Sequence, residues 1–177
     1  MTSTQPHSSS YDAREIANKI LHLAKESDIS LTSMQLLKLV YLAHGWSLVM
    51  LDDAIVRNTP QAWQYGPVYP TIYKSVKKSG SRPITDMIAD NVTGEIYFPK
   101  DISKQRVRFI ETILTSYGRK RAFDLSSITH KEGTPWYRTY HEIGQYQDIP
   151  IDFMREHFNQ LAEQRKIDTS LFREATS

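Results

Sequence analysis

The sequence of 177 residues contains no cysteine. Without thiols the chain cannot form disulfides, iron–sulfur clusters, zinc sites with cysteine ligands or a cysteine nucleophile. Six histidines are present, but their positions do not follow the HExxH spacing or a similar metal-binding pattern. We therefore expect no resident metal and no cofactor.

Long apolar segments are also lacking, since no run approaches the roughly 18 residues that a membrane span requires. The longest near-apolar stretch, residues 36–51, is interrupted by Lys38, His44 and Ser47. The first ten residues have neither the positive charge nor the apolar core of a secretory signal. The sequence thus predicts a cytoplasmic protein without a membrane partner.

Several catalytic motifs are absent as well. The chain has no phosphate-binding loop motif, no GxGxxG dinucleotide fingerprint and no GxSxG nucleophile elbow. Ser126, Ser127 and His130 fall within one short predicted helix, where they form a nucleophile and base only if a fixed turn geometry brings them together. We therefore expect that the protein is not an enzyme.

Glycine and proline are sparse, with seven and eight residues, while apolar residues make up 40% and charged residues 24% of the chain. This composition is typical of a folded globular domain and excludes collagen-like or low-complexity sequence. The polar residues 1–11 are expected to be a flexible tail, and residues 12–177 a single helical domain.

Helical spacing of apolar residues, with capping residues before each segment, predicts a mainly α-helical fold. The expected helices cover residues 13–26, 33–48, 69–79, 104–118 and 124–130, followed by one that begins at Pro135 and one that follows Pro150. Apolar residues surround the second helix on almost every side, so we expect it to be central and buried.

A small antiparallel β-hairpin is expected after the second helix. Residues 54–57 and 61–65 are its two predicted strands, and Pro60 restricts the loop between them. Gly66 and Pro67 are expected to end the second strand and to lead into the third helix. Residues 95–98 are a candidate for one further strand.

Positive charge is concentrated in the middle of the chain. Residues 74–131 contain twelve Lys and Arg against six Asp and Glu, whereas the segments on either side are weakly acidic. The basic clusters are Lys74, Lys77, Lys78 and Arg82, then Lys104, Arg106 and Arg108, then Arg119, Lys120 and Arg121. Solvated helix faces are the favoured interpretation. A shared face could bind nucleic acid or an acidic protein, but without a recognition helix we expect no sequence-specific nucleic-acid binding.

Lys38 is unusual because it interrupts the apolar second helix, close to Tyr41 on the helical spacing. If its side chain is buried, the ammonium group needs an acceptor. Alternatively, the side chain extends along the helix to reach solvent. Trp63, Tyr65 and Trp136 raise the aromatic content locally, and such residues suit both protein cores and protein interfaces.

Three sequence blocks carry a family resemblance. They are LLKLVYLAHGW at residues 36–46, QAWQYGPVYP at residues 61–70, and a set within residues 117–136 that includes Thr129-His130 and Pro135-Trp136. In this order the blocks resemble the Panacea domain, the phage-associated, SocA-like antitoxin family. The resemblance extends over about residues 13–165.

The resemblance implies a mainly helical antitoxin that neutralises a toxin encoded by the neighbouring gene through direct binding. In one branch of the family the antitoxin also delivers its toxin to a ClpXP-type protease. The family supplies no catalytic residue, so the candidate partner-binding positions are motif residues: Lys38, Tyr41, Trp63, Tyr65, Gly66, Pro67, His130 and Trp136. The alternative is an enzyme or small-molecule binder with a pocket formed by Lys38, Tyr65, His130 and Trp136.

Overall fold

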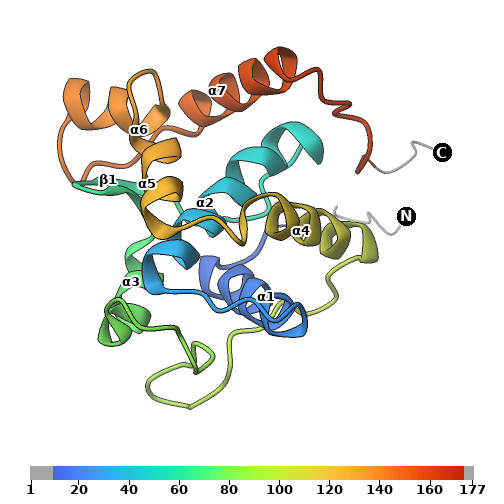
Figure 1. Cartoon of the computed structure of the whole chain (residues 1–177), viewed down its shortest axis with the longest axis vertical. Coiled ribbons are helices and arrows are strands. Elements are labelled where there is room, and N and C mark those ends of the chain that lie inside the picture. The colour runs from blue at the N-terminus through green and yellow to red at the C-terminus, as the bar shows by residue number, and fades with distance from the viewer. Residues whose placement is uncertain (1–9, 174–177) are drawn as a thin grey trace, which may run out of the picture.

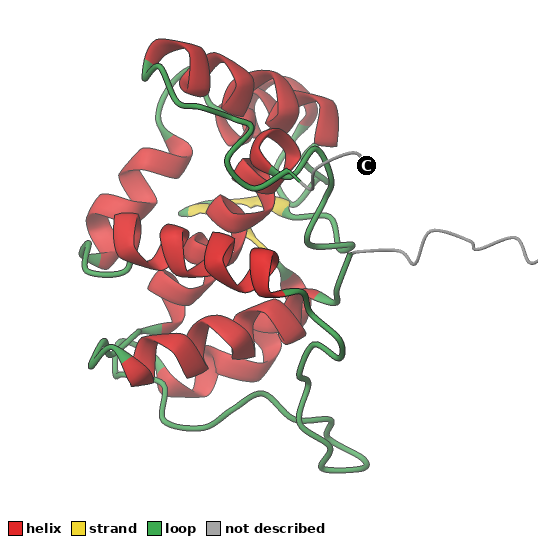
Figure 2. Cartoon of the chain, turned by 90° about the vertical axis from the view of Figure 1, so that its right-hand side faces the viewer, coloured by secondary structure: helices red, strands yellow, loops and turns green. Residues whose placement is uncertain are grey.

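The structure, a computed structural model, describes residues 10–173 and is mainly α-helical in this range (Figure 1). The elements in chain order are α1 (Ala13–Glu26), α2 (Ser33–Met50), β1 (Gln61–Trp63), β2 (Gly66–Val68), α3 (Pro70–Val76), the 3₁₀-helix η1 (Lys77–Ser79), α4 (Lys104–Tyr117), α5 (Ala122–His130), α6 (Pro135–Arg138), the π-helical turn η2 (Thr139–Ile143) and α7 (Ile151–Gln164). Figure 2 shows the two short strands among the helices. The predicted fold class, mainly α with a small antiparallel sheet, is confirmed.

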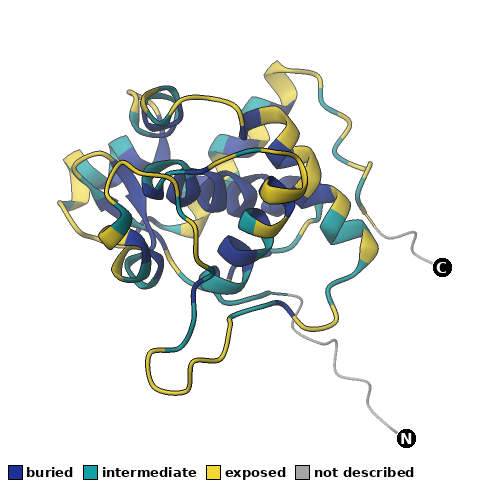
Figure 3. Cartoon of the chain, turned by 60° about the horizontal axis from the view of Figure 1, so that its bottom comes forward, coloured by how far each residue is buried: buried dark blue, intermediate teal, exposed yellow. Residues whose placement is uncertain are grey.

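The central position of α2 follows from its apolar surface. Helices α1, α3, α4, α5 and α7 all pack against it, and Figure 3 shows the buried residues gathered in the middle of the molecule. The helix begins with the predicted capping box, in which Thr32 Oγ1 accepts from the Gln35 amide and Gln35 Oε1 accepts from the Thr32 amide. The expectation of a buried central helix is therefore confirmed.

The hairpin differs from the prediction. Strand β1 pairs with β2, with Ala62 opposite Pro67, so Gly66 and Pro67 form the second strand instead of ending the first. Gly66 has φ +112°, which lets the chain reverse over only two residues before β2 begins. The predicted strand at residues 54–57 is wrong, because Val56 makes only an isolated parallel bridge to Tyr11.

The candidate strand at residues 95–98 is also wrong. Within the long loop between η1 and α4, Ile96 forms only an isolated bridge with Ala89. The loop is instead fixed by Asn18, a fully buried residue of α1. Its amide nitrogen donates to the carbonyl oxygens of Ile88 and Tyr97, at 2.8 and 2.6 Å, and its oxygen accepts from the Ile88 amide at 2.8 Å.

The predicted tail, residues 1–11, lies outside the described residues except for Ser10 and Tyr11. The Tyr11 amide donates to Ile55 O at 2.9 Å, and the Arg57 amide donates to Tyr11 O at 2.9 Å. These bonds attach the start of the described chain to the loop that follows α2. No helix in residues 10–173 is long and apolar enough to cross a membrane.

Candidate functional site

The β1–β2 hairpin is the structure on which the motif residues converge. Three side chains from three helices donate hydrogen bonds to alternate backbone carbonyls of the hairpin. The bonds run from Trp136 Nε1 of α6 to Trp63 O at 2.6 Å, from Ser126 Oγ of α5 to Tyr65 O at 2.8 Å, and from Lys38 Nζ of α2 to Pro67 O at 3.0 Å. Because each bond starts from a different helix, the hairpin is held in one position relative to the core.

Lys38 is fully buried, which confirms the prediction that it needs an acceptor and excludes the solvent-reaching alternative. Its ammonium nitrogen bonds to Pro67 O and lies directly beneath Gly66. Burial disfavours the charged form and lowers the pKa of Lys38 to about 7. Near neutral pH the residue therefore exchanges between a charged and an uncharged donor, and both forms can hold Pro67 O.

Replacing Gly66 with alanine is expected to destabilise the protein by about 2–4 kcal/mol. A Cβ at this position would lie 2.8 Å from Lys38 Nζ, in a backbone conformation with φ +112°. Gly133→Ala is the matched control, because Gly133 also has positive φ, +84°, but nothing lies within 4 Å of a Cβ there. Urea denaturation should give the control a loss of only about 1 kcal/mol, and equal losses would contradict the contact with Lys38.

Tyr41 and Trp136 are core residues, although the sequence named them as candidate partner contacts. Tyr41 is 1% exposed, and its hydroxyl has no hydrogen-bond partner among the described residues. Burial raises the pKa of Tyr41, so the phenol stays protonated. Trp136 is 5% exposed and stacks on Tyr140 with ring centroids 4.6 Å apart. Both side chains are therefore buried in the folded chain, and their role in partner binding stays a prediction.

Ser126 and His130 lie closer together than the sequence alone indicates. Their Oγ and Nδ1 atoms are 3.2 Å apart within α5. However, the Ser126 hydroxyl donates to Tyr65 O, and His130 Nδ1 also lies against the Ser126 carbonyl oxygen, to which it donates when protonated. The serine proton is thus directed away from the histidine. This arrangement does not form a nucleophile and its base.

The four residues of the alternative pocket have different surroundings in the structure. The side chains of Lys38 and Trp136 donate hydrogen bonds to backbone carbonyls of the hairpin, while the side chain of Tyr65 is 62% exposed. His130 packs edge-on against Trp136 with ring centroids 5.2 Å apart. Lys38 and Trp136 therefore position the hairpin, whereas Tyr65 is exposed at its tip and His130 packs on Trp136, an arrangement that favours an anchored hairpin over a shared pocket.

Exposed aromatic residues surround the hairpin. Trp63 is half-buried and contacts Tyr73 of α3 and Tyr146 edge-on, with ring centroids 5.0 and 5.5 Å apart. Tyr65, Tyr73 and Tyr146 are 62%, 37% and 59% exposed. We call Trp63, Tyr65, Tyr73 and Tyr146 the hairpin aromatic surface. Tyr73 and Tyr146 are not among the candidates that the sequence offered. Tyr146 reaches the hairpin because its backbone amide donates to Ala62 O at 2.8 Å.

Two comparisons with known proteins bear on the family of this chain. The family model described as antitoxin SocA-like, Panacea domain, matches residues 36–137. Antitoxin SocA of Caulobacter vibrioides (strain NA1000 / CB15N) is 33% identical over 132 residues, which are 72% of this chain and 69% of that protein. The chain belongs to the Panacea-domain family. No solved structure matches it.

The Panacea-domain match contains the hairpin and all three side chains that anchor it. Residues 36–137 begin in α2 just before Lys38 and end just after Trp136. Of the hairpin aromatic surface, Trp63, Tyr65 and Tyr73 lie within this range, and Tyr146 lies outside it. The sequence resemblance was expected to extend over residues 13–165, so the family match is shorter than that expectation.

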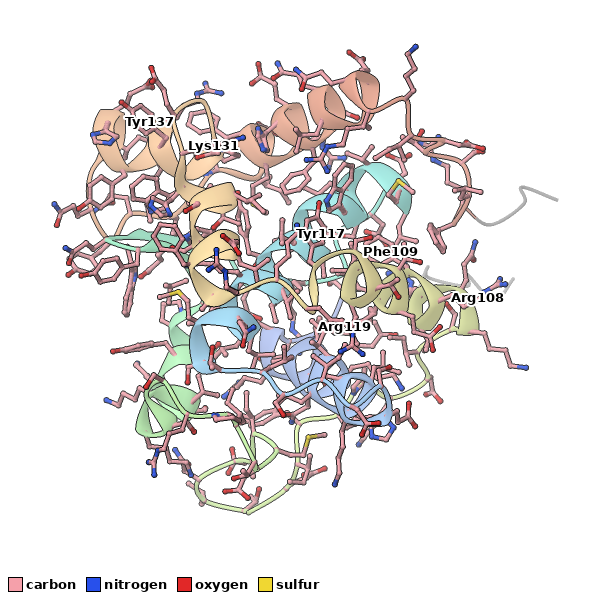
Figure 4. The ribbon with its side chains drawn as sticks, in the orientation of Figure 1. Arg108, Phe109, Tyr117, Arg119, Lys131 and Tyr137 are labelled. Carbon is pink, nitrogen blue, oxygen red and sulfur yellow. The ribbon has the colours of Figure 1, made fainter. Side chains whose placement is uncertain are left out.

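The basic clusters of this Panacea domain are distributed over separate parts of the structure. Helices α3 and α4 flank α1 (Figure 1). Figure 4 shows Arg108 towards one end of α4 and Arg119 just beyond its other end. Arg106 pairs with Asp53 at 3.1 Å, and Arg121 pairs with Asp124 at 2.9 Å. The arrangement favours solvated helix faces over one continuous nucleic-acid surface. Residues 10–173 also contain no group of three or more side chains placed to hold a metal.

Proposed function

We propose that this protein is an antitoxin that neutralises a toxin by binding it directly through the hairpin aromatic surface. Family membership indicates the antitoxin role. The observation that supports this particular surface is the hairpin, fixed by three buried donors, which presents exposed aromatic rings at the edge of the fold. The toxin is expected to be the product of the neighbouring gene, as the sequence resemblance implies.

The chemistry of the surface suits protein recognition. Tyrosine and tryptophan are enriched among residues that dominate binding energy, because they offer a large apolar area and a polar end. A surface that is already fixed loses little conformational entropy on binding. The exposed hairpin tip, with Tyr65 outward and its carbonyl held by Ser126, combines both properties.

Co-expression tests the proposal. The neighbouring gene is induced in cells with and without this chain, and growth is measured before affinity purification of the chain. We expect growth arrest by the neighbouring gene alone, relief by this protein and recovery of a complex. Arrest that the protein does not relieve, with no complex recovered, would refute the antitoxin function.

Tyr65→Ala is expected to weaken toxin binding by about 2 kcal/mol, which is roughly thirtyfold in Kd. The side chain is 62% exposed, so the free energy of unfolding should change by less than about 0.5 kcal/mol. Val92→Ala is the control, since Val92 is 94% exposed in the loop between η1 and α4. Titration calorimetry measures both variants, and equal affinities would place the toxin surface elsewhere.

A more specific part of this proposal is that the protein delivers the toxin to a ClpXP-type protease. This part rests on the sequence resemblance. It predicts that toxin degradation by the purified protease requires this protein. A toxin half-life that the protein leaves unchanged would restrict its function to neutralisation by binding. A cytoplasmic location and a role without catalysis belong to the same proposal, because membership of the antitoxin family supports both.

A further inference from the structure

The hairpin aromatic surface is followed by a basic stretch of the chain. Residues 54–85, which contain the hairpin, α3 and η1, include no Asp or Glu, although the whole chain has twenty acidic residues. The same residues include five Lys and Arg, of which four come after the hairpin. We call these four, Lys74, Lys77, Lys78 and Arg82, the α3 basic strip. The hairpin and the strip therefore belong to one segment whose only charged side chains are positive.

Helix α3 places part of this strip beside the aromatic rings. Tyr73 of α3 contacts the ring of Trp63 edge-on, with ring centroids 5.0 Å apart. Lys77 lies one helical turn after Tyr73, and its backbone amide donates to Tyr73 O. Side chains four residues apart share one face of a helix, and both of these side chains are exposed. A partner that covers the Tyr73 ring therefore comes within reach of the Lys77 ammonium group.

The α3 basic strip is not neutralised by its surroundings. All four of its side chains are exposed, and none of them makes an ion pair with another residue in the range 10–173. Two carboxylates, Asp86 and Asp90, line the groove beside Lys74. Even when both carboxylates are counted against the four cations, the strip stays positive. Its natural complement is an acidic surface.

The charge near Tyr146 favours a protein over a nucleic acid as the partner. Asp148 follows Tyr146 by two residues, is exposed, and accepts a hydrogen bond from the side-chain amide of Gln61 at 3.5 Å. A nucleic-acid backbone is negative along its whole length, so its phosphates would be repelled at Asp148. A protein segment can carry carboxylates opposite the strip and lack them opposite Asp148.

We propose that the α3 basic strip binds an acidic segment of the toxin, while the hairpin aromatic surface binds apolar side chains next to that segment. This inference rests on the proposed function for the identity of the partner. Complementary charge of this kind accelerates association and discriminates between partners. Because salt screens exposed charges, binding should weaken as the salt concentration rises.

Short peptides test the strip without the toxin. The probe is a peptide of glutamates around a central leucine, and its control has glutamine in place of each glutamate. Each peptide is titrated at low salt into the full chain labelled with ¹⁵N and followed by NMR. We expect saturable shifts of the Tyr73 and Lys77 amides with the glutamate peptide, and at least about fivefold weaker binding of the glutamine peptide. Equal binding of the two peptides, or shifts confined to other residues, would overturn the proposal. Tighter binding of a single-stranded oligonucleotide of the same charge would overturn it in favour of a nucleic-acid partner.

The product of the neighbouring gene tests the strip in the complex itself. Lys74→Glu combined with Lys77→Glu should weaken its binding at least about tenfold in titration calorimetry. Lys104→Glu combined with Arg108→Glu is the matched control, because it changes the charge equally at exposed positions of α4, and its Kd should change by less than about threefold. Equal Kd values for the two double variants would overturn the acidic segment and leave toxin binding intact. If the original chain does not bind this product, the proposed function fails instead, and the peptide titrations still decide whether the strip binds an acidic segment.

Discussion

Gly45→Ala is expected to destabilise the protein by about 3 kcal/mol or more, although alanine favours a helix over glycine by about 1 kcal/mol. Gly45 lies within α2, where α7 packs against it. A Cβ at this position would lie 2.0 Å from Cε2 of Phe158, well inside van der Waals contact. Phe158 is 1% exposed and contacts the rings of Tyr41 and Trp46, so it has little room to move.

The measurement is the free energy of unfolding from urea denaturation, and the control is a double-mutant cycle with Phe158→Leu. Leucine is smaller than the aromatic ring and makes room for the new methyl group. The double variant should therefore lose at least about 1 kcal/mol less than the sum of the single losses. Additive losses, or a Gly45→Ala variant as stable as the original chain, would show that the close approach of α2 and α7 does not require glycine.

The helices were predictable because their signals are local. Asp12 and Thr32 begin capping boxes, and Thr134 precedes Pro135 at the start of α6, so these three helix starts are specified within four residues. The apolar surface of α2 likewise predicted its central position. Such features depend on side chains one turn apart, which sequence spacing reports directly.

The hairpin pairing was not predictable in the same way. Residues 54–57 have β-branched side chains that suit a strand, but Tyr11 takes the backbone partners of that segment. Gly66 and Pro67 are usual strand-ending residues, yet here the positive φ of Gly66 permits a tight reversal. Pro67 can occupy β2 because its carbonyl has a partner in Lys38 and it needs none for an amide. Each of these outcomes depends on residues distant in sequence.

The candidate site was also predictable only in part from the sequence. The sequence singled out Lys38, Trp63, Tyr65 and Trp136, but it left open which of them lie in the core and which lie at an interface. The structure separates the buried anchors, Lys38 and Trp136, from the exposed Tyr65. That distinction depends on which helix faces the hairpin, and spacing along the chain does not contain this information.

Lys38 is expected to make the stability of the protein depend on pH in a direction that is unusual for a lysine. In the unfolded chain its pKa has the ordinary value of 10.5, whereas in the folded protein burial lowers it to about 7. Between these values the unfolded state binds more protons than the folded state. The free energy of unfolding should therefore rise with pH in this window, by up to about 1.4 kcal/mol per pH unit. Below it both states are protonated, and the contribution no longer changes.

The free energy of unfolding is best measured as a function of pH between about pH 7.5 and pH 9. His44, with a pKa of about 4, has finished titrating below this range, and the buried tyrosines, with raised pKa values, affect stability only above it. Over this range the original chain should gain about 2 kcal/mol in urea denaturation. Lys38→Met, of similar length but without a charge, should lose this gain, while Lys78→Met, at an exposed position of η1, should keep it. A Lys38→Met variant that retains the full pH dependence would mean that Lys38 stays charged in the folded protein, so that its bond to Pro67 O holds the hairpin as a permanently charged anchor.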